Sequence, residues 1–227
     1  ERKRDKLVFV QAEPLMAVAG VAARKKDGQT VSGDTGAWFR LDDGSLYVLL
    51  CDGMGSGREA GEDSALAVRL LEQFLRAGVA TEAALKTLNA ALALRGEDKI
   101  GFTTIDLLKV DLFTGAAAVY KYGAAPTYLR KGDKVTRISG AALPAGLAMG
   151  EGAPDTTALT LAAGDYVLLV SDGVAVSEGD GWLRALVGGF QGDSPKDLAL
   201  ALMEGSEAAA GGTDDRTVIA LKIALRT

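Results

Sequence analysis

The pattern of apolar and polar positions divides the first half of the chain into strands followed by helices. Residues 14–25 are apolar and alternate enough to predict a strand. Residues 36–51 predict a β-hairpin, because two strand-like runs flank Asp43 and Gly44, a favoured turn pair.

Helical spacing replaces this alternation after residue 57. A helix is predicted from Arg58 to Ala77, with Gly78 as its C-terminal stop. Thr81 is predicted to cap a second helix that closes at residues 95–96. The stripe that supports the first helix consists of Leu66, Ala67, Leu70, Leu71, Phe74 and Leu75.

The second half of the chain returns to a period of two. The predicted strands span residues 102–112, 115–123, 126–132, 134–139, 165–171 and 216–225. Between the last two, Ser194 and Pro195 predict the start of a helix that runs to about Glu207, with Ser at the cap and Pro at the first helical position.

This order of elements predicts one α+β domain. Strands, two helices, more strands, a helix and a last strand form separate groups, whereas parallel sheets come from alternating βαβ units. Residues 1–12 are charged at their start and are predicted to be a linker or the end of an upstream helix. Residues 13–227 are predicted to be the folded domain, and the absence of an initial Met predicts an excised piece of a longer protein.

Composition narrows the classes of function. The 227 residues carry a formal net charge of −5, which argues against nucleic-acid binding because a phosphate backbone requires a basic face. No run of 18 apolar residues and no signal peptide occur, so we expect a cytoplasmic segment without membrane contact. This expectation leaves open whether the full-length parent protein is anchored in a membrane. The lone Cys51 favours a reducing compartment.

The chain contains no histidine. This excludes Ser-His-Asp hydrolysis and histidine phosphotransfer, and it removes nearly all zinc catalysis. The chemistry is left to carboxylates, hydroxyls, amines, or metals held by oxygen.

Several acidic residues lie at predicted strand ends. Asp52 follows an apolar strand and precedes a Gly-rich crossing into a helix, and Asp172 ends another such strand. Asp34 opens a strand, and Asp214 and Asp215 precede the last one. Carboxylates gathered from these ends would repel each other unless cations neutralise them, and hard oxygen ligands select Mg²⁺ or Mn²⁺.

Four ordered motifs carry a resemblance to a known family. The segments VSGD at 31–34, CDGMGSG at 51–57, VSDG at 170–173 and DDRTV at 214–218 resemble the motifs of PPM-type (protein phosphatase type 2C) Ser/Thr phosphatases. The chain is similar, more narrowly, to the phosphatase domain of the stage II sporulation protein E and its stress-response relatives. The segments at 121–135 and 143–147 are also in character for that subgroup.

The resemblance implies an αββα sandwich of two antiparallel sheets flanked by helices, with two divalent cations, Mn²⁺ or Mg²⁺. Asp52 would bridge both cations, Asp172 and Asp214 would complete one site, and Asp34 with the backbone carbonyl of Gly53 would serve the other. Asp52 and Asp172 are the catalytic residues on this reading. A water activated by the cations would attack phosphorus in line, without a covalent phosphoenzyme.

The implied substrate is a phosphoserine on a regulatory protein, an anti-sigma-factor antagonist. The sequence does not separate sporulation from stress response, or Mn²⁺ from Mg²⁺, and it leaves open a homodimer. The resemblance also suggests that the helices over 58–95 switch activity, because the first of them begins at the Asp52 loop.

Two positions depart from the family pattern or remain ambiguous in it. Many members carry an Arg before the first motif, but here Arg24, Lys25 and Lys26 lie further upstream and reach the site only if their loop folds back. A shift of one residue would exchange the roles of Asp214 and Asp215.

Three alternatives compete with this reading. A Cys-phosphatase needs five residues between its nucleophile and Arg, whereas six separate Cys51 from Arg58, and the acid after Cys51 opposes a thiolate. A nucleotide loop would need a Lys that GMGSGRE lacks. A pseudo-phosphatase or regulatory binding module with the same fold would be marked by loss of an acidic ligand, yet all four positions are acidic.

Overall fold

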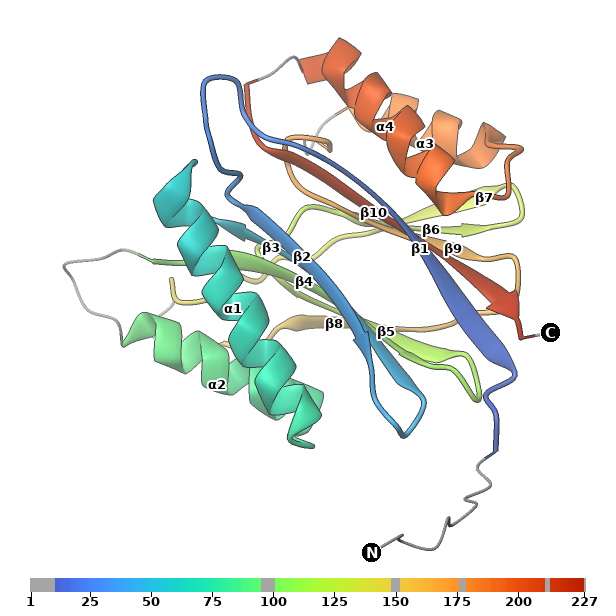
Figure 1. Ribbon diagram of the computed structural model, residues 1–227, viewed down its shortest axis with the longest axis horizontal. Coiled ribbons are helices and arrows are strands. Elements are labelled where there is room, and N and C mark those ends of the chain that lie inside the picture. Colours follow the sequence, from blue (N-terminus) through green and yellow to red (C-terminus); the bar gives the residue numbers. More distant parts are fainter. Residues whose placement is uncertain (1–10, 95–100, 148–151, 176–178, 211–212, 227) are drawn as a thin grey trace, which may run out of the picture.

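The protein is a sandwich of two sheets with helices on both outer faces (Figure 1). The computed structural model describes residues 11–94, 101–147, 152–175, 179–210 and 213–226. All pairings between its named strands are antiparallel. The predicted α+β class and αββα layering are confirmed.

Each sheet has five strands. The first runs in the order β1 (Leu15–Arg24), β10 (Arg216–Leu225), β9 (Tyr166–Val170), β6 (Thr127–Lys131) and β7 (Lys134–Ile138). The second runs in the order β2 (Asp34–Arg40), β3 (Ser45–Gly53), β4 (Thr103–Asp111), β5 (Ala116–Tyr122) and β8 (Asp155–Thr160).

One helix pair covers each sheet. Helices α1 (Arg58–Arg76) and α2 (Thr81–Ala93) pack on the second sheet, and α3 (Gly181–Gly189) and α4 (Pro195–Ala210) lie over the first. None of the helices in the described part of the chain is both long and apolar enough to cross a membrane.

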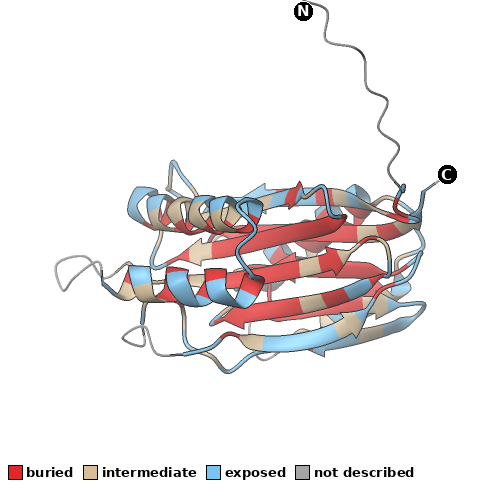
Figure 2. Ribbon diagram, turned by 90° about the horizontal axis from the view of Figure 1, so that it is seen from below, coloured by how far each residue is buried: buried red, intermediate tan, exposed pale blue. Residues whose placement is uncertain are grey.

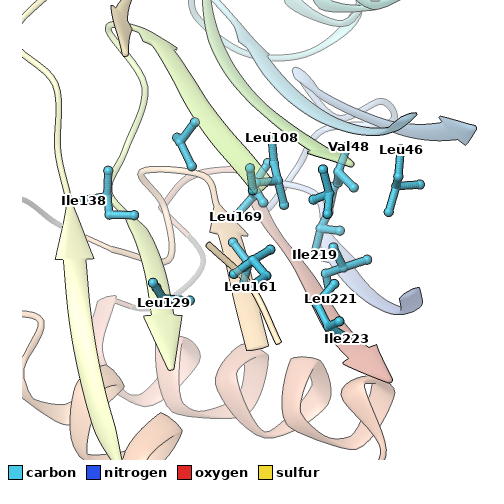
Figure 3. Close-up of a cluster of buried hydrophobic side chains, with 14 of the residues drawn as sticks. Leu46, Val48, Leu108, Leu129, Ile138, Leu161, Leu169, Ile219, Leu221 and Ile223 are labelled. Carbon is cyan, nitrogen blue, oxygen red and sulfur yellow. The ribbon is translucent and has the colours of Figure 1, made fainter. Parts of the chain in front are cut away.

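The core lies in three layers because alternate strand residues face opposite sides of a sheet. Between the sheets, residues such as Val48, Leu169 and Ile219 interdigitate (Figure 3). Separate apolar clusters join α1 and α2 to the second sheet and α3 and α4 to the first. Burial consequently follows the strands, while the outward sides of the helices are exposed (Figure 2).

Local sequence signals located most of these elements. Gly44 adopts a φ of 82° at the predicted hairpin turn, and Gly78 adopts 81° after α1, both in the left-handed region that favours glycine. The predicted cap at Ser194 is confirmed, since its Oγ accepts a hydrogen bond from the Asp197 N–H at 3.2 Å.

The prediction that Thr81 caps α2 is wrong. Ala80 occupies the cap position, and Thr81 is the first helical residue, with its hydroxyl 3.3 Å from the Tyr47 hydroxyl. Thr81 thus lies one position past the cap, where its hydroxyl contacts a residue of β3 and not the helix backbone. The predicted end of this helix at residues 95–96 lies outside the described residues, as does most of the predicted linker over 1–12.

Two elements were not predicted. Strand β8 is an edge strand with no fully buried residue, so it lacks the apolar alternation of its neighbours. Helix α3 contains three glycines in nine residues, which lowers its intrinsic helix propensity. It is held instead by Leu183 and Val187, both fully buried against the first sheet and α4.

Candidate active site

Asp34 and Asp52 sit directly opposite each other on neighbouring strands. Asp34 opens β2 and pairs in register with Asp52, the penultimate residue of β3. Because side chains alternate, Asp52 shares a face with Val48 and Leu50, which belong to the core between the sheets. The two carboxylates therefore stand at the end of the inter-sheet core.

The Asp34 carboxylate is buried and has no cationic partner among the described residues, although the Thr217 and Ser171 hydroxyls lie close to it. Both of its oxygens are inaccessible, and neither has a hydrogen-bond partner among the described residues. Burial raises the pKa of Asp34 to about 6, with smaller upward contributions from the Asp215 and Asp172 charges. The nearby Thr217 and Ser171 hydroxyls oppose this rise in pKa.

Asp52 is perturbed further. Burial, followed by the charges of Asp34, Asp172 and Asp214, raises the pKa of Asp52 to about 8. The backbone of Asp52 is fixed on both sides, because its N–H donates to Thr104 Oγ1 at 3.2 Å and its carbonyl accepts from Thr103 Oγ1 at 2.7 Å. The strand holds the acid in place despite the repulsion.

The other sheet supplies Asp172 and Asp214. Asp172 follows the end of β9 by two residues, and Asp214 precedes β10 by two. Burial and the Asp214 charge raise the pKa of Asp172, although its side chain reaches solvent. The structure thus brings together all four acids that the sequence predicted to converge.

Two cavities share Asp172 and Asp214. One, of about 320 Å³, is also lined by Lys26, Asp52 and Gly53. The other, of about 500 Å³, extends away from Asp52 and is also lined by Arg137, Ser139 and the loop over 123–126. Asp172 and Asp214 therefore lie at the junction of two cavities that are otherwise lined by different residues.

Gly53 packs directly on the first turn of α1. Its N–H donates to the Gly33 carbonyl at 3.2 Å, and a Cβ at Gly53 would lie 2.0 Å from the Ala60 carbonyl oxygen. Similarly, a Cβ at Gly61 would lie 2.6 Å from the Ser32 carbonyl oxygen. Glycine at these positions lets the helix approach the backbone that carries Asp34 and Asp52.

Asp214 and Asp215 differ in what they contact. The Asp215 carboxylate is buried and accepts hydrogen bonds from the N–H groups of Lys26 and Gly33, each at 2.8 Å. The Asp214 carboxylate accepts one from the Asp215 N–H at 2.9 Å, and Asp214 lines both cavities. Asp215 therefore ties the loop between β1 and β2 to the start of β10, while Asp214 faces the hollow.

That tie folds the basic loop back toward the acids. Lys26 lines the 320 Å³ cavity with Asp52 and Asp172. Arg24 instead forms an ion pair with Glu207 of α4. Sequence reasoning identified Lys26 only as one of three cations, because the signal that selects it is a carboxylate 189 positions away.

Cys51 is unsuited to nucleophilic chemistry. It is fully buried in the cluster beneath α1 and α2, and burial together with the charges of Asp106 and Asp52 raises the pKa of its thiol. Cys51 is therefore a buried strand residue.

The residues present fit hard divalent cations with water-rich coordination. No three His, Cys, Asp or Glu side chains of the described residues are grouped closely enough to hold one ion, so a closed protein cage is not preformed. Mg²⁺ is normally bound through one or two carboxylates and retains several waters. The unpartnered oxygens of Asp34 and the raised pKa of Asp52 mark a place where positive charge is needed.

Comparison with known proteins assigns the family. The family model described as stage II sporulation protein E (SpoIIE) matches residues 42–224. The chain belongs to the SpoIIE family. The resemblance predicted from four motifs is thus confirmed, and the family and fold are those of a PP2C-type serine/threonine phosphatase.

Individual SpoIIE relatives support this assignment. The stage II sporulation protein E of Priestia megaterium is 33% identical over 211 residues, covering 90% of this chain and 36% of the relative. The structure of the PP2C phosphatase domain and a regulatory-domain fragment of Bacillus subtilis SpoIIE is 31% identical with a TM-score of 0.85, covering 94% of this chain and 64% of that one. The chain spans about a third of the length of the Priestia relative.

A more distant structure shares the fold alone. RsbX, solved in complex with magnesium, is 21% identical with a TM-score of 0.72, and the match covers 95% of this chain and 98% of RsbX.

Proposed function

We propose that this domain hydrolyses phosphoserine or phosphothreonine on a regulatory protein with the help of two divalent cations, Mn²⁺ or Mg²⁺. Asp52 would contribute to both cation sites, Asp172 and Asp214 to one, and Asp34 with the Gly53 carbonyl to the other. When bound, the cations supply a water of lowered pKa and electrostatic stabilisation of the phosphoryl group.

One observation carries the proposal: the buried carboxylate of Asp34, which has no cationic partner among the described residues, faces Asp52 across two paired strands. A structural carboxylate buried in this way would be expected to pair with a cationic side chain or with N–H donors. Here burial raises both pKa values, and the neighbouring charges are other acids, which raise them further. Bound cations account for this arrangement, and the magnesium complex of RsbX, which shares the fold, agrees with it.

The chain's own residues have distinct tasks. Thr103 and Thr104 hold the Asp52 backbone, and Asp215 holds the loop that carries Lys26 and Gly33. These tasks leave Asp52, Asp172 and Asp214 at the cavities and Asp34 buried opposite Asp52 as the acidic set that we assign to the cations, with Asp214 and not Asp215 as the ligand.

Lys26 is the group that we assign to the substrate phosphate. It is the basic residue that lines the same 320 Å³ cavity as Asp52. The lysine ammonium binds phosphate as a point charge and does not need the fixed bidentate geometry of an arginine guanidinium. Such a group can be carried by a loop residue. This assignment replaces the Arg that many PPM-type phosphatases carry.

The substrate that fits the family is a phosphoserine protein of the anti-sigma-factor antagonist type. Family membership supports a role in sigma-factor regulation. The open cavity of about 500 Å³ beside Asp172 and Asp214 offers room for the peptide that flanks a phosphorylated side chain.

Hydrolysis of p-nitrophenyl phosphate tests the proposal. The domain should be active with Mn²⁺, inactive with EDTA, and inactive as Asp172→Asn. Activity that persists in EDTA would refute the cation requirement. Inactivity of the wild type with Mn²⁺, combined with calorimetric Mn²⁺ binding, would favour the alternative of a regulatory binding module, and absent Mn²⁺ binding would refute the metal site itself.

A further inference from the structure

A buried ion pair lies between the two sheets near the carboxylates. Asp106 of β4 and Lys121 of β5 face each other in register, and each is about 1% exposed. Lys121 Nζ lies 2.8 Å from Asp106 Oδ2. Thr127 of β6, which belongs to the other sheet, donates its hydroxyl to the same oxygen at 2.6 Å. The pair thus joins the two sheets.

Stability alone does not explain this pair. Burial raises the pKa of Asp106 and lowers the pKa of Lys121, and the charge of each partner offsets part of the other's shift. Replacing a buried ion pair by apolar residues of similar size is often neutral or stabilising. Its presence in the core therefore invites a second role.

Lys121 makes a further bond that suggests this role. Its Nζ donates to the Ala125 carbonyl at 2.6 Å. Ala125 belongs to the loop over 123–126, which connects β5 in one sheet to β6 in the other. All four residues of this loop line the 500 Å³ cavity beside Asp172 and Asp214.

The pair also borders the carboxylate cluster. A narrow cavity of about 30 Å³ lies between Asp52 and Asp172 and is lined by Asp106 and by Ala125. Asp106 Oδ1 is buried and has no hydrogen-bond partner among the described residues. The ion pair therefore contacts the loop through Lys121, while Asp106 shares only a small cavity with the acids.

We propose that Lys121 and Asp106 are positioning residues, which hold the loop over 123–126 so that it forms a fixed wall for the peptide that flanks the phosphorylated side chain. This inference rests on the proposed phosphatase function. The pair acts through the loop and touches neither the phosphate nor the cations. A small aryl phosphate, which has no flanking peptide, does not depend on this wall.

The double variant Asp106→Asn with Lys121→Met tests the proposal. It keeps nearly the same shape, removes both charges, and removes the donor to the Ala125 carbonyl. The KM for a short phosphoserine peptide should rise about three- to tenfold, as expected for loss of one hydrogen bond that orders the loop. With p-nitrophenyl phosphate, kcat and KM should stay within about twofold of the wild type, because this substrate has no flanking peptide that could contact the loop. Equal changes with both substrates, or no change, would overturn the positioning role.

Ala125→Gly provides a test that leaves the buried pair intact, in case the double variant does not fold. Glycine loosens the loop backbone, so the peptide KM should again rise while p-nitrophenyl phosphate hydrolysis is retained. Ala163→Gly, in the exposed loop before β9, is the matched control and should change neither. An unchanged peptide KM in Ala125→Gly would refute the inference, whereas a wild type inactive toward both substrates with Mn²⁺ would refute the proposed function instead.

Discussion

Asp34 and Asp52 are register partners on β2 and β3, and their carboxylates stand opposite each other at the end of the inter-sheet core. Like charges directly opposite on neighbouring strands destabilise a sheet. The fold therefore contains an electrostatic conflict that bound cations would relieve, and this conflict leads to measurable consequences.

The stability of the metal-free domain should fall as pH rises. Asp52 has a pKa of about 8 in the folded state, compared with 3.8 for an unperturbed Asp, so protonation of Asp52 favours the fold. The resulting stabilisation is fully present below about pH 4 and is lost as pH rises through about 8. Urea unfolding in EDTA should accordingly give a lower midpoint at pH 8 than at pH 6.

Added Mn²⁺ should remove most of this pH dependence, because the cations neutralise the same carboxylates. The Asp52→Asn variant in EDTA should show a weaker dependence than the wild type. Equal midpoints for the wild type at pH 6 and pH 8 would contradict the electrostatic picture.

Asp214 and Asp215 should separate into a binding role and a structural role. Asp215→Ala loses two buried hydrogen bonds to backbone N–H groups and should cost about 2–4 kcal/mol of unfolding free energy. Asp214→Ala should unfold near the wild-type midpoint but bind Mn²⁺ more weakly. Paired urea and calorimetric titrations distinguish them, and the reverse pattern would make Asp215 the ligand.

Lys26→Ala should raise the KM for a phosphoserine peptide and leave the fold intact, because its side chain is only partly buried and lines the cavity. Loss of one charge-assisted contact predicts an increase of about tenfold in KM. Lys25→Ala, at an exposed neighbouring position, is the matched control. Similar kinetics in the two variants would remove Lys26 from substrate binding.

Gly53→Ala should weaken Mn²⁺ binding by displacing α1. The new Cβ would lie 2.0 Å from the Ala60 carbonyl oxygen, so the helix or the Asp52 strand end must move. Gly55→Ala is a suitable comparison, because Gly55 has a φ of 89° but no atom within 4 Å of the added Cβ. It tests backbone strain without the clash. Weaker binding in both variants alike would point to loop strain and not to the helix contact.

Cys51→Ala should keep full phosphatase activity. The thiol is fully buried and its pKa is raised, so it does not act as a nucleophile. The variant should lose about 1 kcal/mol of stability through the small cavity that it leaves. Loss of turnover in a correctly folded Cys51→Ala protein would contradict the conclusion that Cys51 is not a nucleophile.

The sequence located the strand-end acids because residue type and local pattern agree there. An apolar strand followed by Asp52 and glycines leaves few alternatives, and the same holds for Asp172. The different contacts of Asp214 and Asp215 could not be predicted, because the Asp215 carboxylate accepts from the N–H groups of Lys26 and Gly33, which lie far away in the sequence.

Elements held mainly by tertiary contacts escaped prediction for the same reason. Helix α3 depends on the burial of Leu183 and Val187, and β8 depends on pairing with β5. The pair of Asp106 and Lys121 lies on neighbouring strands and looks from the sequence like ordinary surface charge. Local pattern cannot report such contacts, because they form only when distant segments meet.

The four acids come from both sheets, Asp34 and Asp52 from one and Asp172 and Asp214 from the ends of the other. Cations bound among them would cross-link the sandwich at one end, so metal supply would govern the survival of the protein as well as its turnover. In a cell short of Mn²⁺ or Mg²⁺, the domain would unfold more often and would be cleaved more readily by proteases. Its abundance would then fall together with its activity.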